Sequence, residues 1–124
     1  MQVNPSVDLI IIDEDSTVGG TWSAARIYPG LCVDSPSGAF EFSDMTMSEE
    51  LGIKPWTDLT GDQVHEYLER YVRKYDILER CRLQTKVINA KRTTSGWDVT
   101  VKPAGSPFSD VEILHCDKLI ITTG

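Results

Sequence analysis

Two runs of hydrophobic residues lie near the two ends of the chain. The first run, residues 7–12, is almost continuous and rich in β-branched side chains. Such a run is typical of a strand in a parallel sheet whose two faces are both covered. The second run, residues 119–121, ends on Thr-Thr-Gly. The pattern therefore predicts a buried strand near either end of the chain.

A helix is predicted from Gly61 to Tyr75. Thr60 and Gln63 have the spacing of a capping box, in which hydroxyl and side-chain amide each satisfy an end amide of the helix. The apolar stripe that follows consists of Val64, Leu68, Tyr71, Val72 and Tyr75. The opposite side carries two glutamate–arginine pairs at a spacing of four, Glu66–Arg70 and Glu69–Arg73. Three tyrosines at the same spacing are interpreted as core and rim of the packed helix: Tyr67, Tyr71 and Tyr75.

An antiparallel β-meander is predicted after the helix. Alternation of apolar and polar residues on both sides of a turn at residues 93–96 indicates a hairpin. The alternating residues are Leu83, Thr85 and Val87 before the turn and Trp97, Val99 and Val101 after it. A third short strand follows the next turn and contains Val111, Ile113 and His115.

Residues 23–54 show no sustained period and are interrupted by five glycines and prolines. The pattern predicts about thirty residues of loop, and ordered loops of this length in compact domains are usually functional. The chain contains no internal repeat, low-complexity segment or linker. The fold class expected from these elements is α/β, in a single domain.

Composition narrows the classes of partner. The chain has 124 residues, 40% of them hydrophobic, and a net charge of −7. This charge disfavours nucleic acid and anionic membrane, which are bound through excess lysine and arginine. No apolar run approaches the roughly 20 residues of a membrane span, and the N-terminus lacks the features of a signal peptide. The three scattered cysteines and two distant histidines form no metal motif, so reduced thiols and a cytoplasmic location are expected.

The stretch from Ile10 to Trp22 reads IIIDEDSTVGGTW, a hydrophobic run that ends on acids and continues into a Gly-Gly pair. An acid at the end of a strand can accept hydrogen bonds from ribose hydroxyls, and a glycine turn admits close approach of a nucleotide to the backbone. One interpretation of this pattern is a nucleotide site. The alternative is a solvated strand end with Trp22 packed in the core.

A series of motifs along the chain resembles one family. The acid-ended strand is followed in order by VGGTW, YPG, FEFSD, the helix YLERYVRKYDI, LQTKV, GWDVTV and DKLIITTG. This order closely resembles the flavin-containing monooxygenases and their Baeyer–Villiger relatives, particularly fungal ones. The resemblance covers residues 7–124. It implies that residues 1–124 form a partial FAD/NAD(P)-binding domain, Rossmann-like and doubly wound, with an antiparallel β-meander.

The resemblance also implies an activity and its cofactors. Members use FAD and NADPH to oxygenate a small organic substrate through a flavin peroxide. They begin with a G-x-G-x-x-G turn that places the FAD pyrophosphate on a helix N-terminus. This chain contains no G-x-G-x-x-G, and it stops before the family's NADPH-binding domain. We therefore expect an incomplete fragment that is inactive alone and binds FAD weakly or not at all; the alternative is a non-redox binding module with the same fold.

The family's strand order, 3-2-1-4, places its first strand between the two hydrophobic runs of this chain. The chain lacks that first strand. Either the two runs pair directly, or their unpaired edges recruit a partner strand. Self-association through these edges is expected in the second case.

The site residues that the resemblance implies fall into five groups. Asp13 would bind the adenosine ribose, and Gly19, Gly20, Thr21 and Trp22 would form the turn beside the cofactor. Tyr28 and Asp34 lie where the family covers the isoalloxazine ring, and Asp34 is the candidate catalytic residue, typical of the Baeyer–Villiger variety; an Asx-turn is the alternative for Asp34. Lys86 and Val87 would meet the adenine through their backbone, and Thr123 and Gly124 would end a strand against the cofactor. The aromatic pair Phe40 and Phe42 is interpreted as a short packed strand.

Overall fold

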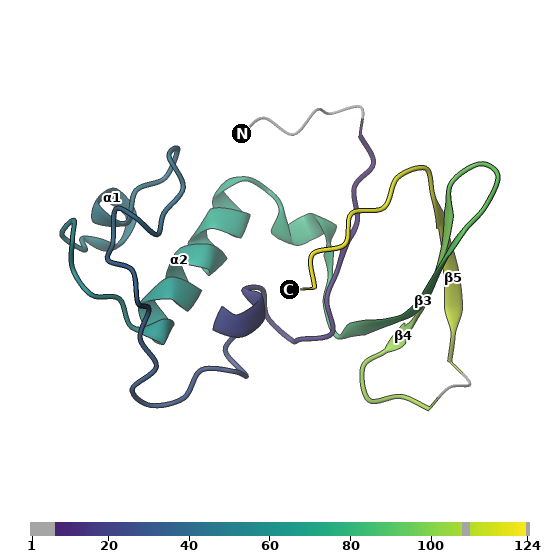
Figure 1. Ribbon diagram of the computed structural model, residues 1–124, viewed down its shortest axis with the longest axis horizontal. Helices are drawn as coiled ribbons and strands as arrows, with labels where there is room; N and C mark the ends of the chain where they lie inside the picture. The colour runs from purple at the N-terminus through teal and green to yellow at the C-terminus, as the bar shows by residue number, and fades with distance from the viewer. Residues whose placement is uncertain (1–6, 108–109, 124) are drawn as a thin grey trace.

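The computed structural model describes residues 7–107 and 110–123. Figure 1 shows a helical part on one side of the molecule and a three-stranded sheet on the other. The strands are β1 Ile11–Ile12, β2 Cys81–Arg82, β3 Thr85–Arg92, β4 Trp97–Pro103 and β5 Glu112–Cys116. The α-helices are α1 Met47–Leu51 and α2 Gly61–Lys74, and the short 3-10 helices are η1 Gly20–Trp22 and η2 Leu78–Arg80.

The described strands form one parallel and one antiparallel sheet. β1 pairs with β2 in parallel, with Ile11 opposite Cys81 and Ile12 opposite Arg82. β3, β4 and β5 pair in this order and antiparallel. The architecture is therefore a mixed helix and strand fold, in which β2 is a parallel strand that the hydrophobic pattern did not predict.

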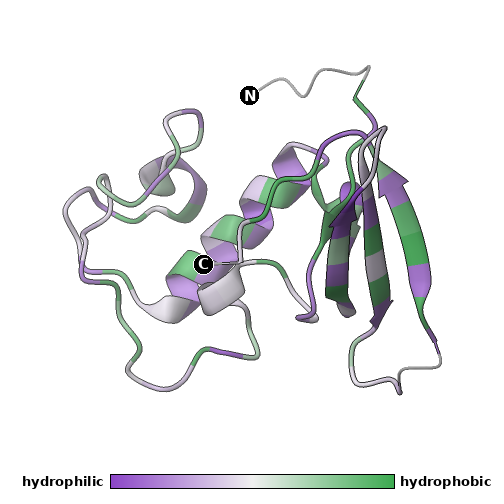
Figure 2. Ribbon diagram, turned by 45° about the vertical axis from the view of Figure 1, so that its right-hand side comes forward, coloured by the Kyte–Doolittle hydropathy of each residue, from purple (hydrophilic) through white to green (hydrophobic). Residues whose placement is uncertain are grey.

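The predicted meander is confirmed. β3 and β4 meet at Arg92 and Trp97, and the N–H of Thr93 donates to the carbonyl of Gly96 at 2.9 Å in the turn between them. Val99 and Val101 of β4 are buried. On β3 the expected alternation holds for Thr85, which is buried, but Val87 is exposed, and a bulge follows between Val87 and Asn89. Figure 2 shows hydrophobic and hydrophilic residues alternating along these strands.

The predicted helix is confirmed as α2. Thr60 and Gln63 form both hydrogen bonds of the capping box. The two predicted pairs on the helix surface are present, with nitrogen–oxygen distances of 2.6 Å for Glu66–Arg70 and 2.9 Å for Glu69–Arg73. Of the three tyrosines, Tyr67 and Tyr71 are buried and Tyr75 packs at the rim of the core.

The long irregular segment is ordered by its contacts with α2. It contains one helix that the pattern missed, α1, whose N-cap is Thr46. The hydroxyl of Tyr67 accepts from the N–H of Phe42 and donates to the carbonyl of Met45, both at 2.7 Å. Met45 and Met47 are buried against Tyr67 and Tyr71 in the main hydrophobic core. The core therefore lies between α2 and this segment rather than between α2 and the sheets.

The two terminal hydrophobic runs do not form the buried strands that the pattern predicted. Only residues 11–12 of the first run are in a strand, and Ile10 is 55% exposed. Residues 119–121 adopt no strand, and Ile120 is 83% exposed. The reason is that a parallel strand needs flanking strands to cover it, and within residues 7–107 and 110–123 only β2 pairs with β1.

The prediction of a short packed strand at Phe40 and Phe42 is wrong. Phe42 forms an isolated bridge with Met45, within a turn, and it is partly exposed. Its ring instead packs against Tyr71, with centroids 4.1 Å apart and the ring planes tilted by 36°. Phe40 packs edge-on against Trp22, with centroids 6.0 Å apart. Both rings therefore help to attach the irregular segment to α2 and η1.

Candidate functional site

The acidic end of β1 is held between the two sheets. The N–H of Asp13 donates to the carbonyl of Arg82 at 3.3 Å, and the carbonyl of Asp13 accepts from the N–H of Thr85 at 2.9 Å. The N–H of Gln84 donates to the carbonyl of Asp15 at 2.9 Å. The backbone of the acidic residues is thus fixed by the chain that joins β2 to β3.

The three acids have different partners. Asp15 accepts from Arg26 Nε at 2.6 Å and from Ser23 Oγ at 3.0 Å, and the hydrogen bond from Arg26 is the main cause that lowers the pKa of Asp15. Glu14 pairs with Lys86 at 2.8 Å. Asp13 Oδ1 accepts from the N–H of Asp15 at 2.8 Å. No described cation forms an ion pair with Asp13, so the Asp13 carboxylate keeps acceptor capacity for hydroxyl groups of a ligand.

The Gly-Gly turn follows in a conformation that requires glycine. Gly19 has φ 117°, and a Cβ there would lie 3.0 Å from the backbone carbonyl of Trp22. Gly20 has φ 56°, and no atom lies within 4 Å of the position of its missing Cβ. The turn is closed by a hydrogen bond from the N–H of Trp22 to the carbonyl of Gly19 at 2.9 Å. The backbone at Gly20 is therefore open to close approach by a ligand, as a phosphate or ribityl chain of FAD requires.

The Glu14–Lys86 pair places β3 beside the acids. Val87 follows Lys86 and is 44% exposed, so its backbone region is accessible. The structure therefore brings together Asp13, the start of β3 with Val87, and the segment that leads into Gly19 and Gly20. The residues present fit the adenosine end of a dinucleotide: an acceptor without a cation partner, an open glycine backbone and an exposed strand start.

The other implied residues lie on a different part of the chain. Tyr28 is 61% exposed, and its carbonyl accepts from the N–H of Leu31, which is itself tied to the N-terminus of α2 through Gly61. Asp34 is exposed, and Oδ1 accepts from Ser35 Oγ at 3.3 Å. Thr123 is exposed, and Gly124 lies outside the described residues. Among the described residues, no hydrogen bond joins Tyr28, Asp34 or Thr123 to Asp13. Thr21, which follows Gly20 in the turn, is also exposed.

Sequence reasoning missed the partners that order the turn. Ser23 is fully buried and Arg26 is exposed, and both contact the carboxylate of Asp15. The sequence offers little indication of this contact, because an arginine eleven residues after an acid in a loop follows neither the helix nor the strand period. The pair becomes evident only when the turn has been built.

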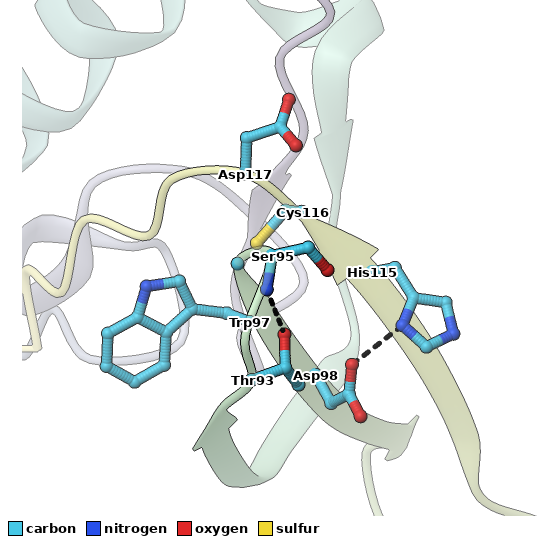
Figure 3. Close-up of a pocket in the computed structure, with 8 residues that line it drawn as sticks. Thr93, Ser95, Trp97, Asp98, His115, Cys116 and Asp117 are labelled. Atoms are coloured by element: carbon cyan, nitrogen blue, oxygen red, sulfur yellow. Dashed lines mark hydrogen bonds and ion pairs between the residues drawn. The ribbon is translucent and has the colours of Figure 1, made fainter.

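A second concave region lies at the hairpin turn. It is lined by residues of that turn and of β5, and Figure 3 shows His115 Nδ1 facing Asp98, 2.7 Å from Oδ1. In the same view Cys116 points away from His115, as successive residues of a strand must. In the part of the chain that the structure describes, no three of His, Cys, Asp and Glu could hold a metal ion together. This region includes none of the residues implied for FAD.

No described helix is long and apolar enough to cross a membrane. Each of the three cysteines, Cys32, Cys81 and Cys116, is a free thiol, as the sequence predicts. Burial is the main cause that raises the pKa of Cys81, whose Sγ lies 3.4 Å from the carbonyl of Ile77. A raised pKa makes the thiol of Cys81 a poor nucleophile at neutral pH.

No family model matches the chain. Among curated proteins, it is 38% identical over 126 residues to the "FAD-dependent monooxygenase resA" of Aspergillus sclerotiorum, and the match covers 100% of this chain and 21% of that protein. It is 39% identical over 130 residues to a FAD-dependent monooxygenase of Pyrenophora dematioidea, over 100% of this chain and 23% of that protein. The chain thus spans about a fifth of the length of these relatives.

Solved structures of Baeyer–Villiger monooxygenases have the same fold over this region. A cyclohexanone monooxygenase with bound epsilon-caprolactone matches 93% of this chain and 21% of its own, with a TM-score of 0.72 and 25% identity. The OTEMO complex with FAD and NADP matches the same shares, with a TM-score of 0.71 and 25% identity. A steroid monooxygenase bound to NADP matches 74% of this chain and 18% of its own, with a TM-score of 0.64 and 26% identity.

Proposed function

Because the chain belongs to the FAD-dependent monooxygenases by its likeness to curated members along its whole length, we propose that residues 1–124 form part of their FAD-binding domain. The domain is Rossmann-like and doubly wound, and the complete enzyme uses FAD and NADPH to oxygenate a small organic substrate. One observation carries the proposal: of the three acids after β1, Asp13 is the one with no described cation partner, and it begins the segment that leads into the open backbone at Gly20.

Each residue near Asp13 has a separate role in this proposal. Asp13 accepts hydrogen bonds from the adenosine ribose hydroxyls, and the backbone of Gly19, Gly20 and Thr21 passes beside the phosphates and ribityl chain. Val87 offers backbone groups to the adenine ring. When bound, FAD supplies the redox chemistry, and the protein contributes binding and orientation. Trp22 fixes the turn, because its ring packs against Phe40 and the core of α2.

The other implied residues act at the flavin ring. Tyr28 and Asp34 lie over the isoalloxazine, where the exposed carboxylate of Asp34 accepts a hydrogen bond near the reacting atoms. Thr123 and Gly124 end a strand against the cofactor. Asp34 is the candidate catalytic residue of this proposal.

A second candidate function is a binding module without redox chemistry. The open backbone at Gly20 beside Asp13 would admit ligands other than FAD as well. The two functions differ in whether this chain binds FAD when it is placed within a complete relative.

We expect the isolated chain to retain no FAD after desalting, because the pyrophosphate lacks its glycine turn. A chimera tests whether the chain can nevertheless serve a FAD site: residues 7–124 replace the matching segment of the Aspergillus sclerotiorum relative. The chimera should retain FAD, as measured by absorbance near 450 nm per mole of protein (roughly one equivalent for a formed site). A colourless, folded chimera would favour the binding module instead.

In that chimera Asp13→Ala should weaken FAD binding by about 1–3 kcal/mol, because ribose hydroxyls would lose a charged acceptor. Glu14→Ala is the matched control, since the exposed Glu14 already pairs with Lys86 and should change the affinity by less than about 1 kcal/mol. Both affinities are measured by flavin fluorescence titration. Equal losses of FAD affinity in the two variants would show that Asp13 does not bind the ribose and is only a solvated residue at the end of the strand.

The exposed terminal runs lead us to expect self-association of the isolated chain. Ile10, Ile120 and Ile121 are exposed, and unpaired apolar strand edges recruit other strands. Light scattering should show a mass above that of the monomer at high concentration. Ile10→Lys should reduce this mass, whereas Trp56→Lys, which changes an exposed apolar residue on a distant turn, should leave it unchanged. A concentration-independent monomer would contradict this expectation.

A further inference from the structure

The carboxylate of Asp15 joins the two ends of the segment that contains the Gly-Gly turn. Oδ2 accepts from Arg26 Nε at 2.6 Å and from Ser23 Oγ at 3.0 Å, and Oδ1 accepts from Arg26 Nη2 at 3.2 Å. The chain between Asp15 and Ser23 contains Gly19 and Gly20. Three hydrogen bonds to one carboxylate therefore close this loop at its base.

These contacts are sheltered from water on the side of Ser23 and exposed on the side of Arg26. Ser23 is fully buried and the side chain of Asp15 is 14% exposed, whereas the side chain of Arg26 is 50% exposed. A further hydrogen bond, from the N–H of Ala24 to Thr17 Oγ1 at 3.0 Å, joins the same two sides of the loop. The charge-assisted hydrogen bond from the buried Ser23 hydroxyl is stronger than an exposed surface pair, so it helps to hold the loop in one form.

The same residue also orients Asp13. The backbone N–H of Asp15 donates to Asp13 Oδ1 at 2.8 Å, while the side chain of Asp15 holds Ser23 and Arg26. Asp15 thus connects the proposed ribose acceptor with the turn that faces the rest of the cofactor. A small displacement of Asp15 would move both.

We infer that Asp15 is a positioning residue for the dinucleotide site, which with Ser23 and Arg26 holds the Gly19–Gly20 turn open beside Asp13. The inference rests on the proposed function for the identity of the ligand, a dinucleotide with ribose and pyrophosphate groups. It does not make Asp15 a contact of that ligand. Its carboxylate is already occupied by Arg26 and Ser23.

Charge gives a second reason for the contact. A pyrophosphate is anionic, and three free carboxylates beside it would repel it. Arg26 neutralises Asp15, and Lys86 neutralises Glu14. The hydrogen bond from Arg26 also holds the pKa of Asp15 below its ordinary value, so the pair stays ionised at neutral pH. Asp13 alone then presents an uncompensated carboxylate, to hydroxyl groups rather than to phosphate.

The test is amide hydrogen exchange of the isolated chain, which needs no cofactor. Asp15→Asn keeps the size of the side chain but replaces one acceptor oxygen by an NH₂ group that faces Arg26 or Ser23. The N–H groups of Trp22 and Ser23, which donate to Gly19 and Gly20, should exchange about tenfold faster in this variant. Amides in the middle of α2 should keep their rates. Glu14→Gln, which breaks only the exposed pair with Lys86, should change neither set.

Two conservative variants separate positioning from general stability. Arg26→Lys retains the charge without the bidentate contact and should give an intermediate rate at Trp22 and Ser23. In the chimera, Asp15→Asn should weaken FAD binding about tenfold, as measured by flavin fluorescence.

Unchanged amide exchange rates at Trp22 and Ser23 would overturn the inference. An equal increase of the exchange rates in α2 would also overturn it, because Asp15 would then contribute only to the general stability of the chain. The outcome is separate from the proposed function. If Asp13→Ala leaves FAD binding unchanged while the amides of Trp22 and Ser23 exchange faster in Asp15→Asn, the proposed function is wrong and the positioning role of Asp15 is supported. If Asp13→Ala weakens binding while Asp15→Asn changes neither exchange nor affinity, only the inference fails.

Discussion

Replacing Gly96 by alanine should destabilise the chain by about 3 kcal/mol or more, as measured by urea unfolding followed by circular dichroism. Gly96 ends the hairpin turn between β3 and β4. A Cβ at this position would lie 2.2 Å from the carbonyl oxygen of Cys116 and 3.1 Å from the Cα of Asp117. Both are backbone atoms, so no side-chain rotation can relieve the contact. The end of β5 would have to move away from β4.

The control for this substitution is Gly105→Ala. Gly105 also lies in a turn of the meander and has φ 78°, but no atom lies within 4 Å of the position of its missing Cβ. Alanine there carries only the cost of a left-handed backbone, about 1–2 kcal/mol. If Gly96→Ala costs no more than Gly105→Ala, the close approach of β5 to the hairpin turn does not exist in solution.

The meander and α2 were predictable because their determinants are local. A capping box needs residues only three apart, and the hairpin turn needs a glycine between two alternating strands. The tyrosines of α2 were placed correctly for the same reason, since a helix repeats its faces within four residues. The five-residue helix α1 is too short to show a period, and it was missed.

The parallel strands were not predictable because burial in a parallel sheet depends on distant segments. Residues 7–12 have the composition of a covered strand, yet the described structure pairs only Ile11 and Ile12, with Cys81 and Arg82. Hydrophobic composition shows that a segment has apolar surface to bury, but it does not show which other segment will cover that surface.

The candidate site was predictable in part. The sequence and its resemblance select Asp13 among three acids by spacing alone, and the ion pairs of Glu14 and Asp15 supply an independent physical reason for the same choice. The hydrogen bonds of Asp15 with Ser23 and Arg26 could not be predicted from the sequence. These two partners approach Asp15 only through a turn with two left-handed glycines.

Tyr67→Phe should lower the free energy of unfolding by about 2–4 kcal/mol, although it removes a single oxygen atom. The hydroxyl of Tyr67 bridges the N–H of Phe42 and the carbonyl of Met45, and Met45 and Tyr67 are both buried. Phenylalanine would leave a donor and an acceptor without partners, at about 1–3 kcal/mol for each group that water cannot reach. Tyr75→Phe is the matched control: it lies on the same face of the same helical segment, and its hydroxyl donates to the exposed Asp44 carbonyl at 3.0 Å, so its loss should cost under about 1 kcal/mol.

The pH dependence of stability provides a second measurement for Tyr67. Burial is the main cause that raises the pKa of Tyr67 above its ordinary value near 10. The unfolded chain therefore loses this proton at a lower pH than the folded chain does. The stabilisation is complete below about pH 10 and is lost as the pH rises through the folded pKa. Tyr71 and Tyr75 contribute in the same direction, because burial raises their pKa values too.

Tyr67→Phe should thus lower the free energy of unfolding at neutral pH and make it fall less steeply above pH 10, both measured by urea unfolding across pH. These two effects have one origin, because the burial that prevents ionisation of the hydroxyl also prevents water from replacing it. A variant that loses stability at neutral pH but keeps the alkaline slope would show that the oxygen bridges Phe42 and Met45 in a hydrated site. The irregular segment would then be attached to α2 mainly by Met45, Met47 and the ring of Phe42.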